Sequence, residues 1–352
     1  MTNHRIALIP GDGIGPEVLP PARLVLDAAA RRHDFNMTYT SHDDWSCERY
    51  LREGAMMPDD GIDRLRDADA ILLGAVGHPG VPDHVSLWGL LIPIRRAFRQ
   101  YVNLRPVRVF EGVDGPVRGA RPGEVDFVVV RENAEGEYSE IGGLFNRGLP
   151  EETAVQEAVF TRAGVTRVLD YAFALAARRG GRLTSATKSN GIVHTMPFWD
   201  RIVAERAAAF PDVPWEQEHI DALAAKFVLE PGRFDVVVAS NLFGDILSDL
   251  AAAVAGSVGI APAANLNPER EFPSMFEPVH GSAPDIAGRG VANPLGAIRS
   301  AAMMLDHLGH PAAARDVTDA VVSVLAGTDV RTPDLGGTAT TAEFTDRLLA
   351  FL

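Results

Sequence analysis

Residues 241–249 have the sequence NLFGDILSD and stand between a segment typical of a strand and one typical of a helix. The β-branched apolar run 234–239 precedes them, and the alanine-rich run 250–254 follows. Asp245 and Asp249 are four residues apart, so we expect both carboxylates on one face of that helix, in its first turns, where the macrodipole favours negative charge. Two carboxylates there are half of a site for a hard divalent cation. An acidic first turn with no metal is the simpler interpretation of this spacing alone.

The rest of the chain repeats the order of strand and then helix. Strands are predicted at 5–9, 69–73, 126–130 and 182–186, and helices at 16–31, 90–101, 164–178, 196–209, 222–229, 295–308, 312–325 and 341–352. This alternation favours an α/β fold with much parallel pairing. Residues 132–150, rich in Gly, Glu and Asn, are expected to form a loop or small excursion. No linker divides the chain, so a split into two consecutive domains is not favoured.

The bulk composition limits the classes of partner. The 352 residues carry a net charge of −14, which argues against non-specific binding to nucleic acid or to an anionic membrane. The longest uncharged apolar stretch, 250–265, is too short to span a bilayer. A single cysteine, Cys47, excludes an internal disulfide framework and, with no apolar leader at the N-terminus, favours a cytoplasmic protein. An anionic substrate would need a local cluster of positive charge.

The glycine-rich segment 10–16, PGDGIGP, follows a predicted strand and opens a predicted helix, as the turn of a Rossmann fold does. Its glycines are spaced G-x-G-x-G rather than G-x-G-x-x-G, and Pro16 removes a backbone N–H that could bind a phosphate. The sequence therefore argues against a Rossmann dinucleotide site at this position.

A cluster of positive charge does occur. Five arginines fall within fourteen residues of the acidic chain, at positions Arg95, Arg96, Arg99, Arg105 and Arg108. Arginine binds carboxylates through two parallel hydrogen bonds, so the cluster could receive an acidic substrate. A solvated helix face is the alternative, most directly for Arg96, Arg99 and Arg108.

Taken together, these motifs identify a resemblance. NLFGDILSD closely resembles the metal-binding signature of the β-decarboxylating dehydrogenases, the isocitrate and isopropylmalate dehydrogenase family, and PGDGIGPE at 10–17 resembles the family's opening. Ordered motifs from Gly11 to Asn293 extend the resemblance over nearly the whole chain. It implies the family's two-domain α/β fold, with mixed, largely parallel sheets, which is unrelated to the Rossmann fold. Residues 1–99 and 252–352 would form the cofactor-side domain, and residues 100–251 the domain for substrate, metal and dimerisation.

The resemblance assigns roles to three arginines and two catalytic residues. Arg95 and Arg105, the latter in NLRP at 103–106, match the family's substrate-carboxylate segment, and Arg131 matches a third arginine. Lys188, in the pattern K-x-N, matches the residue that accepts the proton of the substrate hydroxyl. Tyr138 matches the tyrosine that protonates the enol carbon after decarboxylation. The alternatives are a solvated lysine and a tyrosine packed in a loop.

The family's metal site also implies an assembly. Asp221 matches a third metal carboxylate beside Asp245 and Asp249, and the implied ion is Mn2+ or Mg2+. In this family Asp221 and the segment around Lys188 reach into the partner subunit's site, so the resemblance implies a homodimer with shared active sites. Glu218 and His219 also suggest zinc, but no further Cys or His spacing supports that.

The cofactor segment HGSAPDIAG at 280–288 resembles the family's adenine and ribose loop. The expected cofactor contacts are His280, Gly281, Ser282, Ala283, Asp285, Asn293 and Asn190. Asp285 could accept hydrogen bonds from both ribose hydroxyls, and its charge would repel a 2′-phosphate. NADP-using relatives place Lys and Tyr where this chain has Asp285 and Ile286, so the implied cofactor is NAD. A monovalent cation such as K+ is a further candidate cofactor.

The segment VPDHVSLWGLL at 81–91 looks like the tartrate and D-malate dehydrogenase branch of the family. Trp88 replaces the Glu of isopropylmalate enzymes, while Leu91 and Ile92 keep an apolar wall. The resemblance therefore implies NAD-dependent, divalent-metal-dependent oxidative decarboxylation of D-malate to pyruvate and CO2, with activity on tartrate. The alternative within the family is 3-isopropylmalate dehydrogenase.

Two other classes of protein fit the sequence less well. A Mg2+-dependent kinase would need a phosphate loop of the form G-x-x-x-x-G-K-[ST], which the sequence lacks. A non-catalytic acidic assembly protein would need neither the arginine cluster nor HGSAPD. Formation of NADH from D-malate with Mn2+ separates the three classes in one assay.

Overall fold

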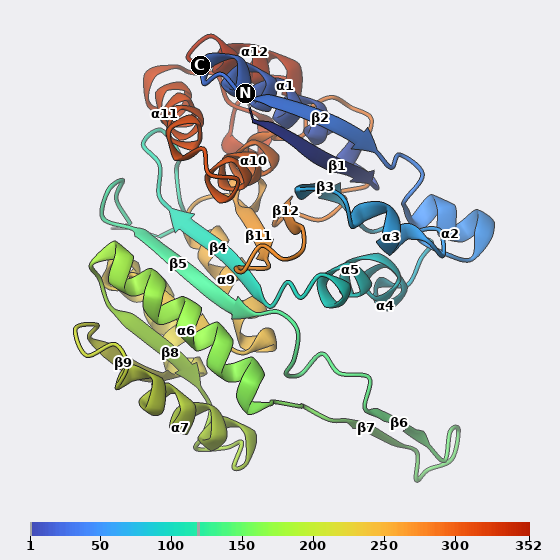
Figure 1. Cartoon of the computed structure of the whole chain (residues 1–352), viewed down its shortest axis with the longest axis vertical. Helices are drawn as coiled ribbons and strands as arrows, with labels where there is room; N and C mark the ends of the chain where they lie inside the picture. The colour runs from blue at the N-terminus through green and yellow to red at the C-terminus, as the bar shows by residue number, and fades with distance from the viewer. Residues whose placement is uncertain (1, 118–119) are drawn as a thin grey trace.

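The computed structural model describes residues 2–117 and 120–352, and a ten-stranded sheet runs through the whole molecule (Figure 1). Its strand order is β2-β1-β3-β12-β11-β4-β5-β10-β8-β9. The strands are β1 (Asn3–Gly11), β2 (Asn36–Ser41), β3 (Ala70–Ala75), β4 (Val102–Arg108), β5 (Asp126–Glu132), β8 (Leu183–Thr187), β9 (Trp215–His219), β10 (Val236–Ala239), β11 (Pro262–Leu266) and β12 (Ser274–Pro278). All the strands predicted from the sequence overlap members of this sheet.

The sheet is mixed, and its antiparallel part lies at the centre. β11 pairs antiparallel with β12 and β4, and β4 pairs antiparallel with β5. Both flanks are parallel, from β2 to β12 on one side and from β5 to β9 on the other. This confirms the expected α/β class with a mixed, largely parallel sheet.

Two parts of the chain each supply half of the sheet. The half from β2 to β11 comes from residues 3–75 and 262–278, and the half from β4 to β9 comes from residues 102–239. The chain thus leaves the first half and returns to it later, as the division into 1–99 plus 252–352 and 100–251 anticipates. The boundaries of those two domains stay a prediction.

Helices cover both faces of the sheet. The larger ones are α1 (Gly15–Arg32), α6 (Arg162–Arg179), α7 (Thr195–Ala207), α8 (Ile220–Leu229), α9 (Asn241–Val254), α10 (Leu295–His307), α11 (Pro311–Gly327) and α12 (Thr341–Leu349). In Figure 1, α6 and α7 lie in front of the strands of the second half, and α9 lies behind them. The short helices α2 (Cys47–Glu53), α3 (Gly61–Leu65), α4 (Asp83–Ser86) and α5 (Ile92–Ala97) cluster beside β3.

Helix α9 begins earlier than predicted. Its first residue is Asn241, so Asp245 lies a full turn inside the helix and Asp249 a turn further, and the prediction that both occupy the first turns is wrong. The negative charge at the N-terminus comes from another loop instead. Glu137 accepts hydrogen bonds from the backbone N–H of Leu242 at 3.0 Å and from the hydroxyl of Ser240 at 2.7 Å. That carboxylate meets the unpaired donors and the positive end of the helix dipole.

The helix predicted at 90–101 is shorter and less regular. A π-helical turn over Leu87–Leu91 leads into α5, which ends at Ala97. The helix stops because Arg99 has a positive φ of 48°, which a helix cannot continue. π-helical turns are often found at functional sites, and this one lies beside the cavity described below.

Residues 142–156 form a hairpin that projects away from the rest of the molecule (Figure 1). Its strands are β6 (Gly142–Phe145) and β7 (Thr153–Gln156). The arm and its base expose large apolar side chains, namely Ile141, Leu144, Phe145, Leu149, Val155 and Val159. The loop or small excursion expected at 132–150 is therefore confirmed in part, because residues 142–150 form the first half of this β-arm.

Candidate active site

A cavity of about 220 Å³ opens between the two halves of the sheet. Helix α9 and β5 line one side, and the π-helical turn, α5, the end of β12 and the loop after it line the other. Eight of the residues predicted for the site line this cavity: Leu91, Arg95, Arg105, Arg131, Tyr138, Asp245, His280 and Gly281.

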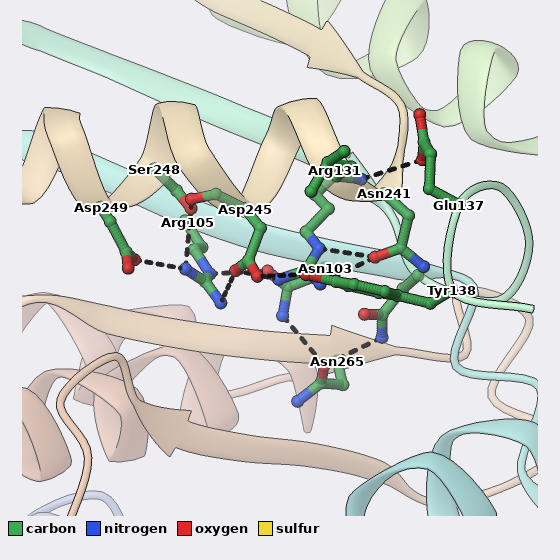
Figure 2. Close-up of polar contacts among 12 residues, drawn as sticks. Asn103, Arg105, Arg131, Glu137, Tyr138, Asn241, Asp245, Ser248, Asp249 and Asn265 are labelled. Atoms are coloured by element: carbon green, nitrogen blue, oxygen red, sulfur yellow. Dashed lines mark hydrogen bonds and ion pairs between the residues drawn. The ribbon is translucent and has the colours of Figure 1, made fainter. Parts of the chain in front are cut away.

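Asp245 lies between two of the predicted arginines (Figure 2). Nη1 of Arg131 donates to Oδ1 of Asp245, and Nη2 of Arg105 is 3.3 Å from the same oxygen. Arg131 is buried, and Asn241 fixes its orientation by accepting from Nε at 2.9 Å and from Nη2 at 2.7 Å. The α9 motif thus positions Arg131, an arginine predicted to bind substrate, as well as the carboxylates.

Arg105 extends the same network along α9. Its Nη1 donates to the Ser248 hydroxyl at 2.7 Å and to Oδ1 of Asp249 at 3.0 Å, and its Nε donates to Oδ1 of Asn103 at 2.8 Å (Figure 2). Asp249 lies outside the residues that line the cavity. Burial and the neighbouring Asp245 raise the pKa of Asp249 despite the contact with Arg105.

Tyr138 comes from the loop after β5 and meets the same carboxylate. Its hydroxyl donates to Oδ2 of Asp245 at 2.9 Å. Burial opposes the charged form of Asp245, but the attraction of Arg131 and Arg105 and the hydrogen bond from Tyr138 together hold its pKa below the ordinary value. Burial, followed by the charge of Asp245, raises the pKa of Tyr138. The pair is therefore an ionised carboxylate beside a protonated phenol.

Arg95 reaches the cavity from the opposite side. Its Nη2 donates to Oε1 of Glu277 at 2.9 Å, and Asn265 donates to the same oxygen at 2.7 Å. The Nε of Arg95 is buried and has no hydrogen-bond partner among the described residues. A buried donor left unpaired beside a cavity suits an anionic ligand that would accept from it.

Lys188 and Asp221 lie apart from this cavity within the chain. Nζ of Lys188 donates to Oδ1 of Asp221 at 2.8 Å, and this contact lowers the pKa of the Asp221 carboxyl. Neither residue lines the cavity, and Asn190, two residues after Lys188, is exposed. One chain therefore brings together Asp245, Asp249, Tyr138 and the arginines but leaves the pair Lys188–Asp221 at a separate edge.

The predicted cofactor loop begins at the rim of the cavity and packs against the glycine-rich opening. The backbone N–H of Ile14 donates to the carbonyl of Ser282 at 2.8 Å, and a Cβ on Gly13 would lie only 1.9 Å from that oxygen. The glycines of the opening thus allow the two loops to approach closely, rather than cradle a phosphate. Ala283 has a positive φ of 41°, and Asp285 is exposed with no ion pair among the described residues.

Two other predicted residues have different surroundings. Asn293 is buried, donates to Oδ2 of Asp334 at 3.0 Å and accepts from the backbone N–H of Leu295 at the start of α10. Trp88 does not line the cavity. Its ring lies 4.8 Å from the Arg96 guanidinium. The apolar wall is formed by the predicted Leu91 and Ile92 together with Leu87.

Comparison with known proteins decides the family. The sequence pattern of the isocitrate/isopropylmalate dehydrogenase family matches residues 5–348. The chain belongs to this family. It is 55% identical to D-malate dehydrogenase (decarboxylating) of Escherichia coli strain K12, over 99% of this chain and 98% of the relative. It is 54% identical to tartrate dehydrogenase/decarboxylase of Pseudomonas putida, over 97% and 95%.

Solved structures of the isocitrate/isopropylmalate dehydrogenase family share the fold. The isocitrate dehydrogenase of Methylococcus capsulatus superposes with a TM-score of 0.88 at 35% identity, covering 99% of each chain. A β-decarboxylating dehydrogenase of Thermococcus kodakarensis in its apo form gives 0.78 at 36% identity, covering 99% of this chain and 96% of its own. The expected family, fold and tartrate/D-malate branch are thereby confirmed, with enzymes of the decarboxylating dehydrogenase type as relatives.

The family depends on NAD and a divalent metal, and the site has the donors for such an ion. No three Asp, Glu, His or Cys side chains come together as a metal cluster within residues 2–117 and 120–352. Asp245 and Asp249 nevertheless present carboxylate oxygens one helical turn apart, the donors that Mg2+ and Mn2+ prefer. A third carboxylate and substrate oxygens would complete the shell.

The loop at 280–288 also fits a bound cofactor. Nε2 of His280 is buried and has no partner in the described part of the chain, although His280 lines the cavity. Burial lowers the pKa of His280, so its ring is neutral at pH 7; because Nδ1 donates to the carbonyl of Gly281 at 3.0 Å, Nε2 is left as an acceptor.

The structure adds site residues to which the sequence assigns no role. They are Leu87, Asn103, Glu137, Asn241, Ser248, Asn265 and Glu277, each in contact with a predicted residue, with the N-terminus of α9 or with the cavity. A search for polar residues next to predicted arginines and carboxylates would have found Asn103, Asn241 and Ser248. Within the described residues, no helix has both the length and the apolar character to cross a membrane.

Proposed function

We propose that the protein catalyses NAD-dependent, divalent-metal-dependent oxidative decarboxylation of D-malate to pyruvate and CO2, and that it also acts on tartrate. The observation that carries the proposal is the convergence of Arg95, Arg105 and Arg131 on one cavity with Tyr138 and Asp245. The relatives named above as D-malate and tartrate dehydrogenases favour this substrate class over 3-isopropylmalate.

The three arginines would hold the substrate's two carboxylates from both sides of the cleft. Arg105 and Arg131 stand on the α9 side, while Arg95, with its unpaired Nε, stands on the opposite side. Guanidinium groups fixed by Asn103, Asn241 and Glu277 are already oriented, so less side-chain entropy is lost when a dicarboxylate binds.

Two proton transfers are assigned to side chains. Lys188 would accept the proton of the substrate hydroxyl, directly or through water, and Tyr138 would later deliver a proton to the carbon that has lost CO2. The raised pKa of Tyr138 keeps its hydroxyl protonated until that carbon becomes basic. Asp245 orients the phenol through the hydrogen bond to Oδ2.

Asp245 and Asp249 would hold Mn2+ or Mg2+, and residues 280–288 with Asn293 and Asn190 would hold NAD. When bound, the ion supplies Lewis-acid polarisation of the hydroxyl and its neighbouring carboxylate, and NAD accepts the hydride. The free carboxylate of Asp285 favours NAD over NADP. A monovalent cation such as K+ is included in the proposal as a further cofactor.

We infer that the enzyme is a homodimer of the cytoplasm in which each subunit completes the other's site. Two observations support the dimer. The pair Lys188–Asp221 lies outside the cavity of its own chain, and a β-arm with six exposed large apolar side chains projects from the fold. A second copy would cover the arm and bring Lys188 and Asp221 to the neighbouring Asp245 and Asp249.

The test is NADH formation by the purified enzyme with Mn2+ and, in parallel, D-malate, the tartrate stereoisomers, isocitrate and 3-isopropylmalate. We expect the highest kcat/KM for D-malate and measurable turnover of a tartrate. A higher kcat/KM for 3-isopropylmalate would favour the alternative, 3-isopropylmalate dehydrogenase. No NADH from any of these acids would refute both functions.

A further inference from the structure

A second cavity, of about 860 Å³, lies on the face of the sheet opposite to the candidate active site. The alternation of side chains along the strands indicates this placement, although Val107 also contributes to the second cavity. On β4, Arg105 lines the active-site cavity, whereas Pro106 and Arg108 line the second one, and on β11 Ala263 and Ala264 divide in the same way. Successive side chains of a strand point to opposite faces of the sheet. We call this second cavity the back groove.

The back groove gathers positive charge on an acidic protein. Five arginines line it: Arg108, Arg178, Arg270, Arg299 and Arg315. Among the described residues, none of the five forms an ion pair with a carboxylate, whereas other arginines of the chain, such as Arg49, Arg95, Arg131 and Arg179, do. The lining carboxylates are fewer, and one of them, Asp126, is already paired with Arg179 at 3.0 Å.

Among the described residues, Arg299 has no direct ion pair, and the charge of Asp126 acts on it only from a distance. Its Nη1 donates to the carbonyl of Ile260, and its guanidinium lies 4.8 Å from the centre of the Phe110 ring. Arg108 lies over the same ring at 5.5 Å, so two cations share one aromatic side chain. Burial, and then the charge of Arg108, lower the pKa of Arg299 to about 9, which still leaves it charged at pH 7.

The walls of the groove come from both halves of the sheet. Arg108 and Arg178 belong to residues 102–239, and the other three arginines belong to the C-terminal part of the chain. In Figure 1, α6 lies on one side of β4, and α10 and α11 lie on the other. Phe110, Phe276 and Met303 give the groove an apolar component beside the arginines.

We propose that the back groove is a binding site for a small anion that carries two or more carboxylate or phosphate groups and an apolar or planar part. Arginine forks match the oxygens of both group types, and a bound anion would give Arg299 and Arg108 the direct ion pair that they lack among the described residues. The site is separate from the candidate active site because it faces the other side of the same strands.

The test is isothermal titration calorimetry at low ionic strength. In one arm, benzene-1,3,5-tricarboxylate is titrated into the metal-loaded enzyme. In the other arm, inorganic tripolyphosphate is titrated into metal-free enzyme, because this probe chelates metals. We expect Arg108→Gln and Arg315→Gln each to weaken binding roughly tenfold, because each removes a charge-assisted contact. The matched control is Arg31→Gln, which removes an exposed arginine on α1 that has no ion pair among the described residues.

Arg131→Gln separates the two cavities. Binding in the back groove should be unchanged by Arg131→Gln, and every variant should show cooperative thermal unfolding above the titration temperature before it is titrated. Binding of neither probe, or weakening by Arg131→Gln but not by Arg108→Gln and Arg315→Gln, would overturn the proposal. Which probe binds decides between a carboxylate and a phosphate ligand. Catalytic activity is not the readout, so failure of the proposed function would leave this result intact.

Discussion

The hydroxyl of Tyr138 donates a hydrogen bond of 2.9 Å to Oδ2 of Asp245, although the two residues are 107 positions apart in the chain. Oδ1 of the same carboxylate accepts a hydrogen bond from Arg131. Asp245 thus links the proposed proton donor, a proposed substrate-binding arginine and the proposed metal site. Changes at this one side chain should therefore affect several steps of the reaction at once.

Asp245→Asn should reduce kcat/KM roughly a thousandfold, or about 4 kcal/mol of transition-state stabilisation, because it removes a metal carboxylate without changing the shape of the side chain. The fold should survive, since Arg131 keeps both hydrogen bonds to Asn241. The measurements are activity over a Mn2+ titration and thermal unfolding, with the exposed Asp59→Asn as control. Near-wild-type activity at limiting Mn2+ would remove Asp245 from the metal site.

Lys188→Ala and Tyr138→Phe should damage different steps. The lysine variant should fail at oxidation of the hydroxyl, whereas Tyr138→Phe should retain more of that step and protonate the enol poorly. Supplying oxaloacetate directly and following loss of CO2, and following NADH formation from D-malate in a second assay, separates the two. Identical defects of both variants in both assays would contradict the assignment.

Asp285 should set the cofactor preference. Its carboxylate is exposed and has no ion pair among the described residues, so it is available to the ribose hydroxyls and would repel a 2′-phosphate. Asp285→Lys combined with Ile286→Tyr should shift the ratio of kcat/KM towards NADP by an order of magnitude or more. The measurement is that ratio for wild type and double variant. The idea is falsified if the wild type already uses both cofactors equally.

Mixed dimers test whether subunits share their sites. Lys188→Ala and Asp245→Asn subunits should each be inactive alone, yet a hybrid dimer should recover one intact site, because Lys188 and Asp221 would serve the neighbouring Asp245. Activity after subunit exchange, verified by mass difference or by a tag, should reach about a quarter of the wild-type value if exchange is random and one site of each hybrid works. No recovery after verified exchange would mean that each chain builds its own site.

Most of the fold could be predicted from the sequence, because apolar periodicity and motif spacing are local signals. The strands at 126–130 and 234–239 are buried β-branched runs, and they became β5 and β10. Strands β4, β11 and β12 were not predicted, since NLRP, PAANL and SMFEP contain proline and buried polar residues rather than an apolar alternation. Their polar side chains are buried because they serve the site.

The site was predicted residue by residue but not as a network. Arg105, Arg131 and Asp245 meet as expected, whereas the amide and hydroxyl groups that hold them, on Asn103, Asn241 and Ser248, were quoted without a role. Such supporting contacts depend on which strands lie side by side, and a single sequence does not state this. The start of α9 was missed for a related reason, because Glu137, which caps it, comes from a distant loop.

The last prediction concerns the substrate's third carbon. Leu87 and Leu91 line the cavity, and the Trp88 ring packs on Arg96, which lines it too, so Trp88 would shape the pocket through Arg96. The wild type should prefer D-malate to 3-isopropylmalate in kcat/KM, since the latter adds an isopropyl group that the cavity must accommodate. Trp88→Ala should lower the ratio of kcat/KM for D-malate to kcat/KM for 3-isopropylmalate, because Arg96 would lose its contact with the Trp88 ring and could move away from the cavity.

Leu91→Ala is the matched comparison, because it opens the apolar wall directly and leaves the contact between Trp88 and Arg96 in place. A pocket that accepts an isopropyl group gains on the order of 2 kcal/mol from its burial, or about thirtyfold in relative kcat/KM. We expect Leu91→Ala to favour 3-isopropylmalate at least as much as Trp88→Ala does. A wild type that already prefers 3-isopropylmalate would refute the substrate assignment while leaving the fold and the arginine site in place.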